Sequence, residues 1–282
     1  MDRTRIRRTE AQLPGARGEI LFRREWRGPA PERSLLLVHG LAEHSGRYEH
    51  FGTWFAERGC AVHAYDLIGH GRSDGARGHL RKFSDYLDDL EAMLRFVREH
   101  EPELPIVLVG HSMGGLVVTT YASERGPEVA GVVTSGAALT LSSDVSPRTV
   151  ALANALALFL PRIRLDAKVD PAGLSRSPAV VQDYCDDPLV FSKVTLSMAK
   201  ALFGAIRRSA SAGSRIRVPM LLLHGEDDPI CPVVGSRLML SQLEVGRAAL
   251  TTYPGLLHEI FNEPEHERVF EDLLEWLLAR TG

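Results

Sequence analysis

The sequence predicts an α/β fold, with a doubly wound, mostly parallel sheet and an inserted helical cap. Three observations predict it. Short apolar runs alternate with longer segments of helical periodicity. The runs are almost continuously apolar, which is typical of strands that helices cover on both faces. The alternation breaks once, from about residue 139 to about residue 213. Strands that alternate with helices are generally parallel and joined by right-handed crossovers.

The expected strands and helices follow this alternation along the chain. The apolar or β-branched runs predicted as strands are 34–38, 61–65, 106–109, 129–135, 220–223 and 249–253. The segments predicted as helices are 48–58, 83–100, 116–124, 233–243 and 265–278. An earlier run, 19–26, is expected to add an antiparallel edge strand. Residues 1–8 carry several arginines but no apolar run follows them, so we expect a solvated tail rather than a secretory signal.

The interval that breaks the alternation contains no convincing strand. It holds an apolar helix candidate (150–160) that stops at Pro161, a segment punctuated by prolines, and a second helix candidate (194–207). A helical block between two strands predicts a cap over the carboxyl ends of the strands, where ligands bind in open α/β sheets. The expected parts are a core of residues 1–138 and 214–282 and a cap of residues 139–213. An ordinary long crossover is the alternative.

Composition restricts the class of protein further. The chain has 282 residues, of which 44% are apolar, enough for a sizeable core in one domain. The net charge of -3, a pI near 6.4 and the lack of a concentrated basic stripe argue against nucleic-acid binding. Three widely spaced cysteines, Cys60, Cys185 and Cys231, favour a reducing compartment over a disulfide framework. The longest apolar stretch is too short to span a bilayer. We expect a cytoplasmic protein.

The strongest functional signal is the motif G-H-S-M-G at residues 110–114. A predicted strand runs directly into it, and a predicted helix follows at once. This is the context that the nucleophile elbow G-x-S-x-G requires. The turn is so sharp that the positions two before and two after the serine must lack side chains. Ser112 is the expected nucleophile, at a helix N-terminus that favours developing negative charge. A simple glycine-rich turn is the alternative.

A His-Gly pair ends an early predicted strand, in the run 35–41. Where a nucleophile elbow is present, this loop supplies one backbone N–H to the oxyanion and the residue after the serine supplies the other. We expect the N–H groups of Leu41 and Met113 to form this oxyanion hole, each worth about 3 kcal/mol to the transition state. His39 is expected to order the loop, because its spacing to His44 does not suit a metal and no H-E-x-x-H helix exists.

Position in the chain selects the base, because there are eleven histidines. The expected order is Ser, then Asp or Glu, then His, with the last two on loops after the final strands. His258 lies after the last predicted strand, whereas His224 lies at a strand end and His266 belongs to the C-terminal helix. His258 is therefore the expected base. The acid comes from three adjacent carboxylates that spacing alone does not distinguish, Glu226, Asp227 and Asp228.

The chain resembles the monoacylglycerol lipase family of α/β-hydrolases, within the serine aminopeptidase S33 and lysophospholipase-like group. The most specific matches are HGLAEHSGRY at 39–48, GLSR at 173–176 and YCDDPL at 184–189. Widely shared or supporting matches are YDLIGHGRS at 65–73, GHSMGG at 110–115 and GEDDPIC at 225–231. The resemblance covers about residues 35–276 and implies the α/β-hydrolase fold. It aligns the triad with Ser112, Asp228 and His258, with Asp227 as the second candidate for the acid.

The same resemblance implies a polar pocket for a glycerol head group at Glu43, Arg47, His111 and Tyr184. A diol needs hydrogen-bond partners in a buried pocket, and each unmatched one costs about 1–3 kcal/mol. A structural ion pair that pins the loop is the alternative for Glu43 and Arg47. Cys231 matches a position where relatives carry a thiol sensitive to modifying reagents, and an inert small residue is the alternative.

The chain departs from the family pattern at Leu41 and Ala42, which replace a small Ala-Gly pair. The backbone donor is kept, and the acyl pocket is expected to be narrower. By analogy with relatives, the apolar helix 150–160 is expected to line an acyl tunnel, to touch a membrane or micelle surface transiently and to pack partly on the core.

The implied reaction is hydrolysis of a monoacylglycerol, a small-molecule lipid ester, to glycerol and fatty acid through an acyl-enzyme, without metal or cofactor. A broad-specificity carboxylesterase or a lysophospholipase on the same scaffold is the alternative among enzymes. Outside enzymes, the alternative is a ligand receptor that retains the triad. Dehalogenases of this fold need an aspartate nucleophile, so Ser112 argues against that chemistry.

Overall fold

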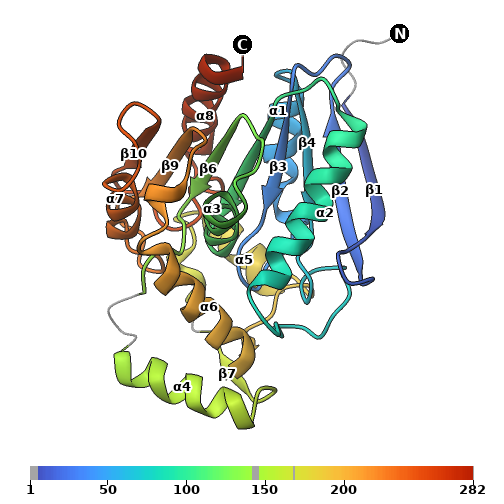
Figure 1. Ribbon diagram of the computed structural model, residues 1–282. Helices are drawn as coiled ribbons and strands as arrows, with labels where there is room; N and C mark the ends of the chain where they lie inside the picture. The colour runs from blue at the N-terminus through green and yellow to red at the C-terminus, as the bar shows by residue number, and fades with distance from the viewer. Residues whose placement is uncertain (1–5, 142–145, 168, 282) are drawn as a thin grey trace.

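A central eight-stranded sheet organises the fold (Figure 1). The computed structural model describes residues 6–141, 146–167 and 169–281. The strands lie in the order β1-β2-β4-β3-β5-β6-β9-β10. Their bounds are β1 Arg7–Pro14, β2 Ile20–Arg27, β3 Arg33–Val38, β4 Cys60–Tyr65, β5 Ile106–His111, β6 Gly131–Ser135, β9 Met220–Gly225 and β10 Ala248–Tyr253. β2 pairs antiparallel with β1 and β4, and all other neighbours are parallel. The sheet is mostly parallel, as predicted.

Helices cover both faces of this sheet. They are α1 Glu49–Ala56, α2 Ser84–His100, α3 Met113–Arg125, α7 Val234–Leu240 and α8 His266–Thr281, with short 3-10 helices η1 Ser45–Tyr48 and η3 Gly213–Arg215. Side chains of α2 and α3 join one buried cluster, and those of α1 and α8 join another. Along β3, Leu36 enters the first cluster and Leu35 and Leu37 enter the second. Burial on both faces confirms the doubly wound prediction and explains the continuous apolar runs.

The N-terminal edge of the sheet differs from the prediction. Arg7 and Arg8, expected in a solvated tail, begin β1, and β1 rather than the strand near residues 19–26 forms the edge. The predicted edge strand corresponds to β2, which lies between β1 and β4. The side chains of β1 alternate between exposed and partly buried, so the strand needs no apolar run. A polar edge strand therefore gave no signal in the apolar pattern.

The segment 139–213, called here the inserted segment, lies next to the carboxyl ends of the strands (Figure 1). Its elements are α4 Pro147–Phe159, β7 Arg164–Asp166, η2 Pro171–Gly173, α5 Pro178–Asp186, β8 Lys193–Thr195 and α6 Leu196–Ser209. The two helix candidates of the sequence correspond to α4 and α6. The prediction that this interval has no strand was wrong, because β7 and β8 pair as an antiparallel ribbon. With three residues each, they are too short to show an alternating pattern.

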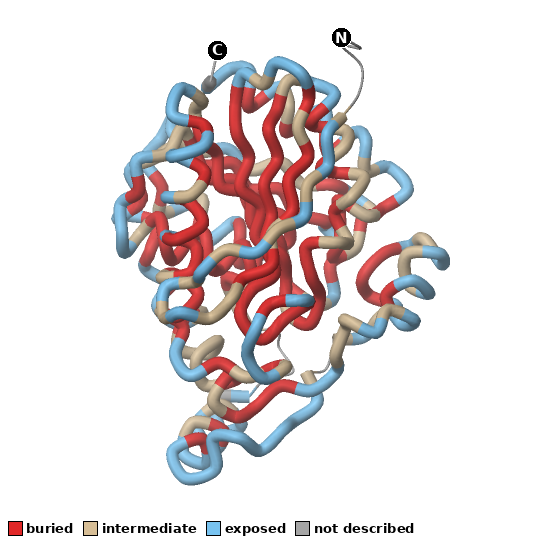
Figure 2. Tube along the Cα trace, turned by 90° about the vertical axis from the view of Figure 1, so that its right-hand side faces the viewer, coloured by how far each residue is buried: buried red, intermediate tan, exposed pale blue. Residues whose placement is uncertain are grey.

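α4 leaves large apolar side chains in solvent. Exposed apolar residues of α4 and the chain after it are Leu152, Leu156, Leu158, Phe159, Leu160, Ile163 and Leu165. The opposite face of α4 places Ala153 and Ala157 against Leu196 and Phe203 in a small cluster of its own. Figure 2 shows the contrast between the buried central strands and the largely exposed end of the molecule that carries α4. Ordinary burial therefore accounts for only one face of this apolar helix.

Candidate active site

Ser112 lies at a strained turn between β5 and α3. Its backbone has φ 52° and ψ −115°, and such a positive φ is rare for a residue other than glycine. The Ser112 N–H donates to the Ser135 carbonyl at 2.9 Å, which ties the turn to β6. A Cβ at Gly110 would collide with the Gly114 carbonyl, and one at Gly114 would collide with the Val38 carbonyl. Both glycines of the motif are therefore required by close backbone approach.

Three loops that are far apart in sequence bring a hydroxyl, an imidazole and a carboxylate into contact. His258 Nε2 lies 2.9 Å from Ser112 Oγ, and His258 Nδ1 lies 2.7 Å from Asp228 Oδ2. The other carboxylate oxygen, Asp228 Oδ1, accepts the N–H groups of Ile230 and Cys231, both at 2.8 Å. These distances suit proton transfer from the hydroxyl to a ring that the carboxylate orients.

Asp228 differs from its two acidic neighbours in burial and contacts. Glu226 is exposed and accepts a hydrogen bond from Thr252 Oγ1 at 2.7 Å. Asp227 is also exposed, whereas Asp228 is buried beside His258. Spacing alone did not distinguish these three carboxylates, because it does not show which side chain points into the protein.

The other histidines named from the sequence lie in different settings. His224, at the end of β9, is fully buried, and His266 is the first residue of α8. His39 Nε2 accepts the N–H of Leu67 at 2.9 Å, and its pKa is lowered mainly by burial. A neutral His39 therefore orders the loop after β3, in line with the expectation.

Electrostatics in the triad favour an ionised acid and a basic imidazole. Burial alone would lower the pKa of His258, but the charge and hydrogen bond of Asp228 outweigh burial and raise it. Burial alone would raise the pKa of Asp228, but the charge of His258 and hydrogen bonds from His224, His258 and the Cys231 N–H hold it well below its usual range. The carboxylate can therefore stabilise an imidazolium without taking its proton.

Two backbone amides beside Ser112 are free to bind an oxyanion. Leu41 and Met113 line the same cavity as Ser112, and neither N–H has an acceptor among the described residues. Met113 is the first residue of α3, where the N–H has no partner within the helix. The neighbouring Gly40 N–H donates to Glu43 Oε1 at 2.6 Å, which fixes the loop that carries Leu41. Free amide donors beside a nucleophile are what an oxyanion hole needs.

A cavity of about 460 Å³ lies over Ser112 and takes side chains from both the core and the inserted segment. Its apolar lining includes Leu174, Leu202, Phe203, Ile206 and Ile230. Its polar lining, apart from the triad, includes Glu43, His111, Tyr184 and Glu259. A mixed lining of this kind suits a ligand with an apolar chain and a polar head.

Glu43 and Arg47 belong to a buried ion cluster with Glu259. Arg47 Nη1 lies 3.0 Å from Glu43 Oε2, and both guanidinium Nη atoms contact the carboxylate of Glu259. Tyr48 donates its hydroxyl to Glu43 Oε1 at 2.7 Å. Burial would raise the pKa of Glu43, but the charge of Arg47 and further contacts lower it to about 2. Glu43 is therefore an ionised carboxylate at the edge of the cavity, held by Gly40, Arg47 and Tyr48.

His111, Tyr184 and Arg47 are placed differently around this cluster. His111 lines the cavity, and burial together with the charge of His258 lowers its pKa to about 4, so the ring is neutral. Tyr184 also lines the cavity, and its ring lies 4.9 Å from the Arg47 guanidinium carbon. Arg47 instead lines a different, smaller cavity of about 320 Å³ that does not include Ser112. Of the four predicted head-group residues, Arg47 alone does not line the catalytic cavity.

Cys231, Leu41 and Ala42 also lie at this site. The Cys231 thiol lines the cavity, and burial and the charge of Asp228 raise its pKa, so it stays protonated. Leu41 contributes to the lining, and the narrower acyl pocket expected from Leu41 and Ala42 stays a prediction. Ala42 is fully buried and has φ 67°, a left-handed conformation that favours glycine.

Three polar residues of the cavity lining were not predicted from the sequence, Thr140, Asp170 and Glu259, and Glu259 is the one that contacts a predicted site residue, Arg47. It follows the predicted base directly, so its position in the chain was known, but its partner lies 212 residues earlier. Glu43 offers only one carboxylate oxygen to Arg47, because its other oxygen accepts the Gly40 N–H. A buried Arg47 therefore needs a second carboxylate, and that need could have indicated Glu259.

The loop of His258 is joined to the inserted segment by backbone hydrogen bonds. The His258 N–H donates to the Gly173 carbonyl at 3.3 Å, and the Glu259 N–H donates to the Leu174 carbonyl at 2.7 Å. The buried carboxylate of Glu263 accepts the Leu257 N–H at 2.8 Å and also holds residues 175–176. His258 and residues 173–176 of the inserted segment therefore share one hydrogen-bonded junction.

Within residues 6–141, 146–167 and 169–281, no group of three or more His, Cys, Asp or Glu side chains is arranged to hold a metal ion. In the same ranges, no helix has the length and apolarity needed to cross a bilayer.

Comparison with known proteins gives consistent matches over most of the chain. The family model described as serine aminopeptidase, S33, matches residues 29–265. A monoacylglycerol lipase of Mycolicibacterium smegmatis is 36% identical over 96% of this chain and 98% of its own length. A human monoglyceride lipase is 33% identical over 96% of this chain and 90% of its own length. The crystal structure of a monoacylglycerol lipase from Paleococcus ferrophilus is 36% identical, covers 92% of this chain and 99% of its own, and superposes with a TM-score of 0.84.

Proposed function

This chain belongs to the serine aminopeptidase S33 family of α/β-hydrolases, and on that premise we propose that it hydrolyses monoacylglycerols to glycerol and free fatty acid. The contact chain Asp228–His258–Ser112 within a cavity of mixed polarity carries the proposal. The relatives that match nearly the whole chain supply the substrate class.

The proposed reaction has two halves that share one set of groups. His258 Nε2 takes the proton of Ser112 Oγ as that oxygen attacks the ester carbonyl, and the amides of Leu41 and Met113 hold the oxyanion. The carbon–oxygen bond to glycerol breaks, and glycerol takes the proton from His258. Water then gives a proton to His258 and attacks the acyl carbon. The bond to Ser112 breaks, the proton returns to Ser112, and the fatty acid is free.

We assign the polar side of the cavity to the glycerol head group. Glu43, His111, Tyr184 and Glu259 line it and offer oxygen and nitrogen atoms to two hydroxyl groups. Arg47 does not line this cavity, so we assign it a positioning role through its contacts with Glu43 and Glu259. A diol that meets these partners avoids the cost of buried, unmatched polar groups.

We assign the acyl chain to the apolar lining and the role of a cap to the inserted segment. Each methylene buried there contributes roughly 0.8 kcal/mol, so long chains should bind better than short ones until the cavity ends. The exposed apolar side chains of α4 would rest on a lipid surface, where the substrate is concentrated. We therefore infer a cytoplasmic enzyme that makes peripheral, reversible contact with membranes.

Hydrolysis assays on the purified protein test this function. We expect Ser112→Ala to lower turnover of monooleoylglycerol by about a millionfold, because the triad acts as a unit. Ser123→Ala on the same helix removes a hydroxyl that donates only to the Thr120 carbonyl, and it should retain wild-type turnover. Near-normal turnover by Ser112→Ala would end the hydrolase assignment.

A substrate panel then tests the head-group assignment. We expect kcat/KM for monooleoylglycerol to exceed that for dioleoylglycerol, for a lysophospholipid and for a short nitrophenyl ester. A higher value for the lysophospholipid would make the protein a lysophospholipase, and uniform values would make it a general carboxylesterase. Ligand binding without sustained turnover would make it a receptor.

A further inference from the structure

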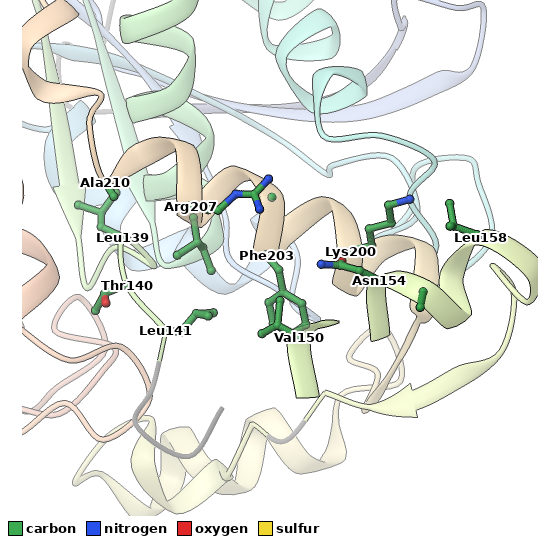
Figure 3. Close-up of a pocket in the computed structure, with 13 residues that line it drawn as sticks. Leu139, Thr140, Leu141, Val150, Asn154, Leu158, Lys200, Phe203, Arg207 and Ala210 are labelled. Carbon is green, nitrogen blue, oxygen red and sulfur yellow. The ribbon is translucent and has the colours of Figure 1, made fainter. Parts of the chain in front are cut away.

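Two parts of the inserted segment pack very differently. α4 and α6 leave between them a cavity of about 690 Å³, lined in part by Leu139, Val150 and Phe203 (Figure 3). Residues 173–176, in contrast, make hydrogen bonds with the chain around His258. This second contact therefore bears directly on the catalytic base.

Three consecutive backbone N–H groups of the base loop, defined here as residues 256–259, are bound in this contact. The Leu257 N–H donates to Glu263 Oε1 at 2.8 Å. The N–H groups of the next two residues donate to the carbonyls of Gly173 and Leu174, at 3.3 and 2.7 Å. A side chain therefore holds the first donor, and the inserted segment holds the other two.

Glu263 also holds the part of the inserted segment that follows Leu174. Its other carboxylate oxygen, Oε2, accepts the Arg176 N–H at 3.0 Å and the Ser175 hydroxyl at 3.2 Å. The Arg176 Nε lies 3.4 Å from the same carboxylate. One oxygen thus binds the base loop, and the other binds the residues that position the two carbonyls facing that loop.

The fold gives Glu263 a rigid origin. The residue lies three positions before α8, and its carbonyl accepts the His266 N–H at 3.0 Å. α8 packs the fully buried side chains of Val269, Phe270 and Leu273 into the core. The carboxylate itself is fully buried. A buried carboxylate whose oxygens are both occupied, on a chain anchored in this way, is held in one position.

The carbonyl side of the base loop is limited by glycines at two strand ends. A Cβ at Gly225, the last residue of β9, would collide with the Leu257 carbonyl oxygen. A Cβ at Gly136, directly after β6, would lie 2.8 Å from the His258 carbonyl oxygen. The strands therefore limit the loop on one side, and its N–H contacts hold it on the other.

We propose that Glu263 is a positioning residue for His258: its carboxylate fixes where the base loop lies relative to Ser112. The inference rests on the proposed function, because it assigns a role in that same reaction. Glu263 lies outside the lining of the catalytic cavity, so it acts through the loop and not on the substrate. His258 Nε2 lies 2.9 Å from Ser112 Oγ, and a misplacement of about 1 Å can cost about a hundredfold in rate. The cost of losing Glu263 therefore falls on the chemical step rather than on substrate binding.

The variant Glu263→Gln tests this role with little change in shape. Its NH2 group replaces one carboxylate oxygen and must face a backbone N–H, of Leu257 or of Arg176, so the contacts on one side of the junction are lost. We expect kcat for monooleoylglycerol and for nitrophenyl butyrate to fall about 10- to 100-fold, with KM changed by less than about twofold. Equal kcat in the variant and the wild type, or a rise in KM without a fall in kcat, would overturn the role.

Glu265→Gln is the matched control. Glu265 lies on the same loop, is half exposed and contacts the guanidinium of Arg176. The substitution leaves the contacts of Glu263 with the Leu257 and Arg176 N–H groups in place, so kcat and KM should stay within about twofold of the wild type. A loss as large as that of Glu263→Gln would assign the effect to the ion pairs of Arg176 and not to the junction.

Positioning is separated from stability by counting reactive serines. A small fluorophosphonate modifies Ser112 to completion, and kcat is expressed per modified serine, well below the melting temperature of each variant. We expect the second-order rate constant of this modification to fall in parallel with kcat, because the reagent needs the Ser112–His258 pair but not the lipid-binding lining. A lower melting temperature with wild-type kcat per serine would mean that Glu263 only stabilises the fold, and the inference would be wrong.

Ser175→Ala is the milder variant, and it serves if Glu263→Gln does not fold. It removes one donor of Oε2 and keeps the carboxylate. We expect kcat to fall about three- to tenfold with KM unchanged, as for the loss of one hydrogen bond. An unchanged kcat would contradict the inference.

The short ester separates this inference from the proposed substrate. If the wild type hydrolysed nitrophenyl butyrate but not monooleoylglycerol, the proposed function would fail, and the short ester would still test Glu263. If the wild type and Glu263→Gln hydrolysed monooleoylglycerol with equal kcat, this inference would fail and the proposed function would stand. The rate constant of Ser112 modification compares the two proteins even without turnover.

Discussion

Arg47 and Glu259, 212 residues apart in the chain, form a two-pronged ion pair with N···O distances of 2.5 and 2.9 Å. The pair joins the loop after β3, which carries one oxyanion donor, to the residue that follows His258. The same guanidinium also contacts Glu43. One buried cation thus links two of the three loops that form the site.

Removal of that cation should cost stability. Arg47→Met leaves the two buried carboxylates of Glu43 and Glu259 without their cation, and breaking a buried pair in this way costs about 3–5 kcal/mol. Arg125→Met, which removes a partly exposed cation from Asp88 and Glu91, should cost less than about 1 kcal/mol. Urea unfolding measures the free energy of unfolding of both variants. Equal losses in the two would contradict the view that Arg47 stabilises the site as a buried cation.

Activity should depend on pH through His258. The base must be neutral to accept a proton, and its pKa is raised by Asp228, so kcat/KM should rise with pH through a midpoint above that of an ordinary imidazole. Asp228→Asn removes the raising charge, so the midpoint should move to lower pH while kcat falls about ten-thousandfold. Asp227→Asn, at an exposed neighbour, should leave both unchanged. A pH–rate profile of each variant checks this, and an unmoved midpoint in Asp228→Asn would refute the pairing.

The left-handed conformation of Ala42 should show in stability. Ala42→Gly relieves a backbone cost of about 1–2 kcal/mol but loses a buried methyl and gains chain entropy in the unfolded state, so the net change should be within about 1 kcal/mol. Ala64→Gly in β4 loses an equally buried methyl without any relief and should cost about 2 kcal/mol. Unfolding free energies of the two variants give the comparison. A larger loss at residue 42 than at residue 64 would mean that its backbone is not strained.

The exposed face of α4 should govern attachment to lipid. Leu158→Ser with Phe159→Ser removes two large apolar side chains, 65% and 83% exposed, and should weaken partition to phospholipid vesicles about tenfold or more. Val245→Ser removes a 99% exposed apolar side chain outside the inserted segment and serves as the control. Vesicle sedimentation measures partition, and turnover of a short soluble ester should be unchanged in both. Equal partition of all three proteins would remove α4 from the lipid-binding surface.

The sequence predicted best where the constraint is local. The glycines around Ser112 are fixed by contacts within a few residues and the end of β3, so a five-residue motif was enough to identify the turn. The strands buried on both faces were equally clear, because each needs apolar residues at successive positions.

The sequence predicted least where partners are distant or elements are polar. The pairing of Arg47 with Glu259 depends on two loops meeting in space, and no local pattern records it. β1 was missed because a polar edge strand buries little, and β7 and β8 because three residues show no period. Asp228 could be preferred to Asp227 only by resemblance, since the direction of each side chain is set by the folded loop.

Two backbone hydrogen bonds couple the inserted segment to the loop of His258. They join His258 to Gly173 and Glu259 to Leu174. If residues 173–174 moved to widen the entrance of the cavity for a bulky lipid, their hydrogen bonds would also move the backbone of His258. A displacement of residues 173–174 would therefore also disturb the contact between His258 and Ser112.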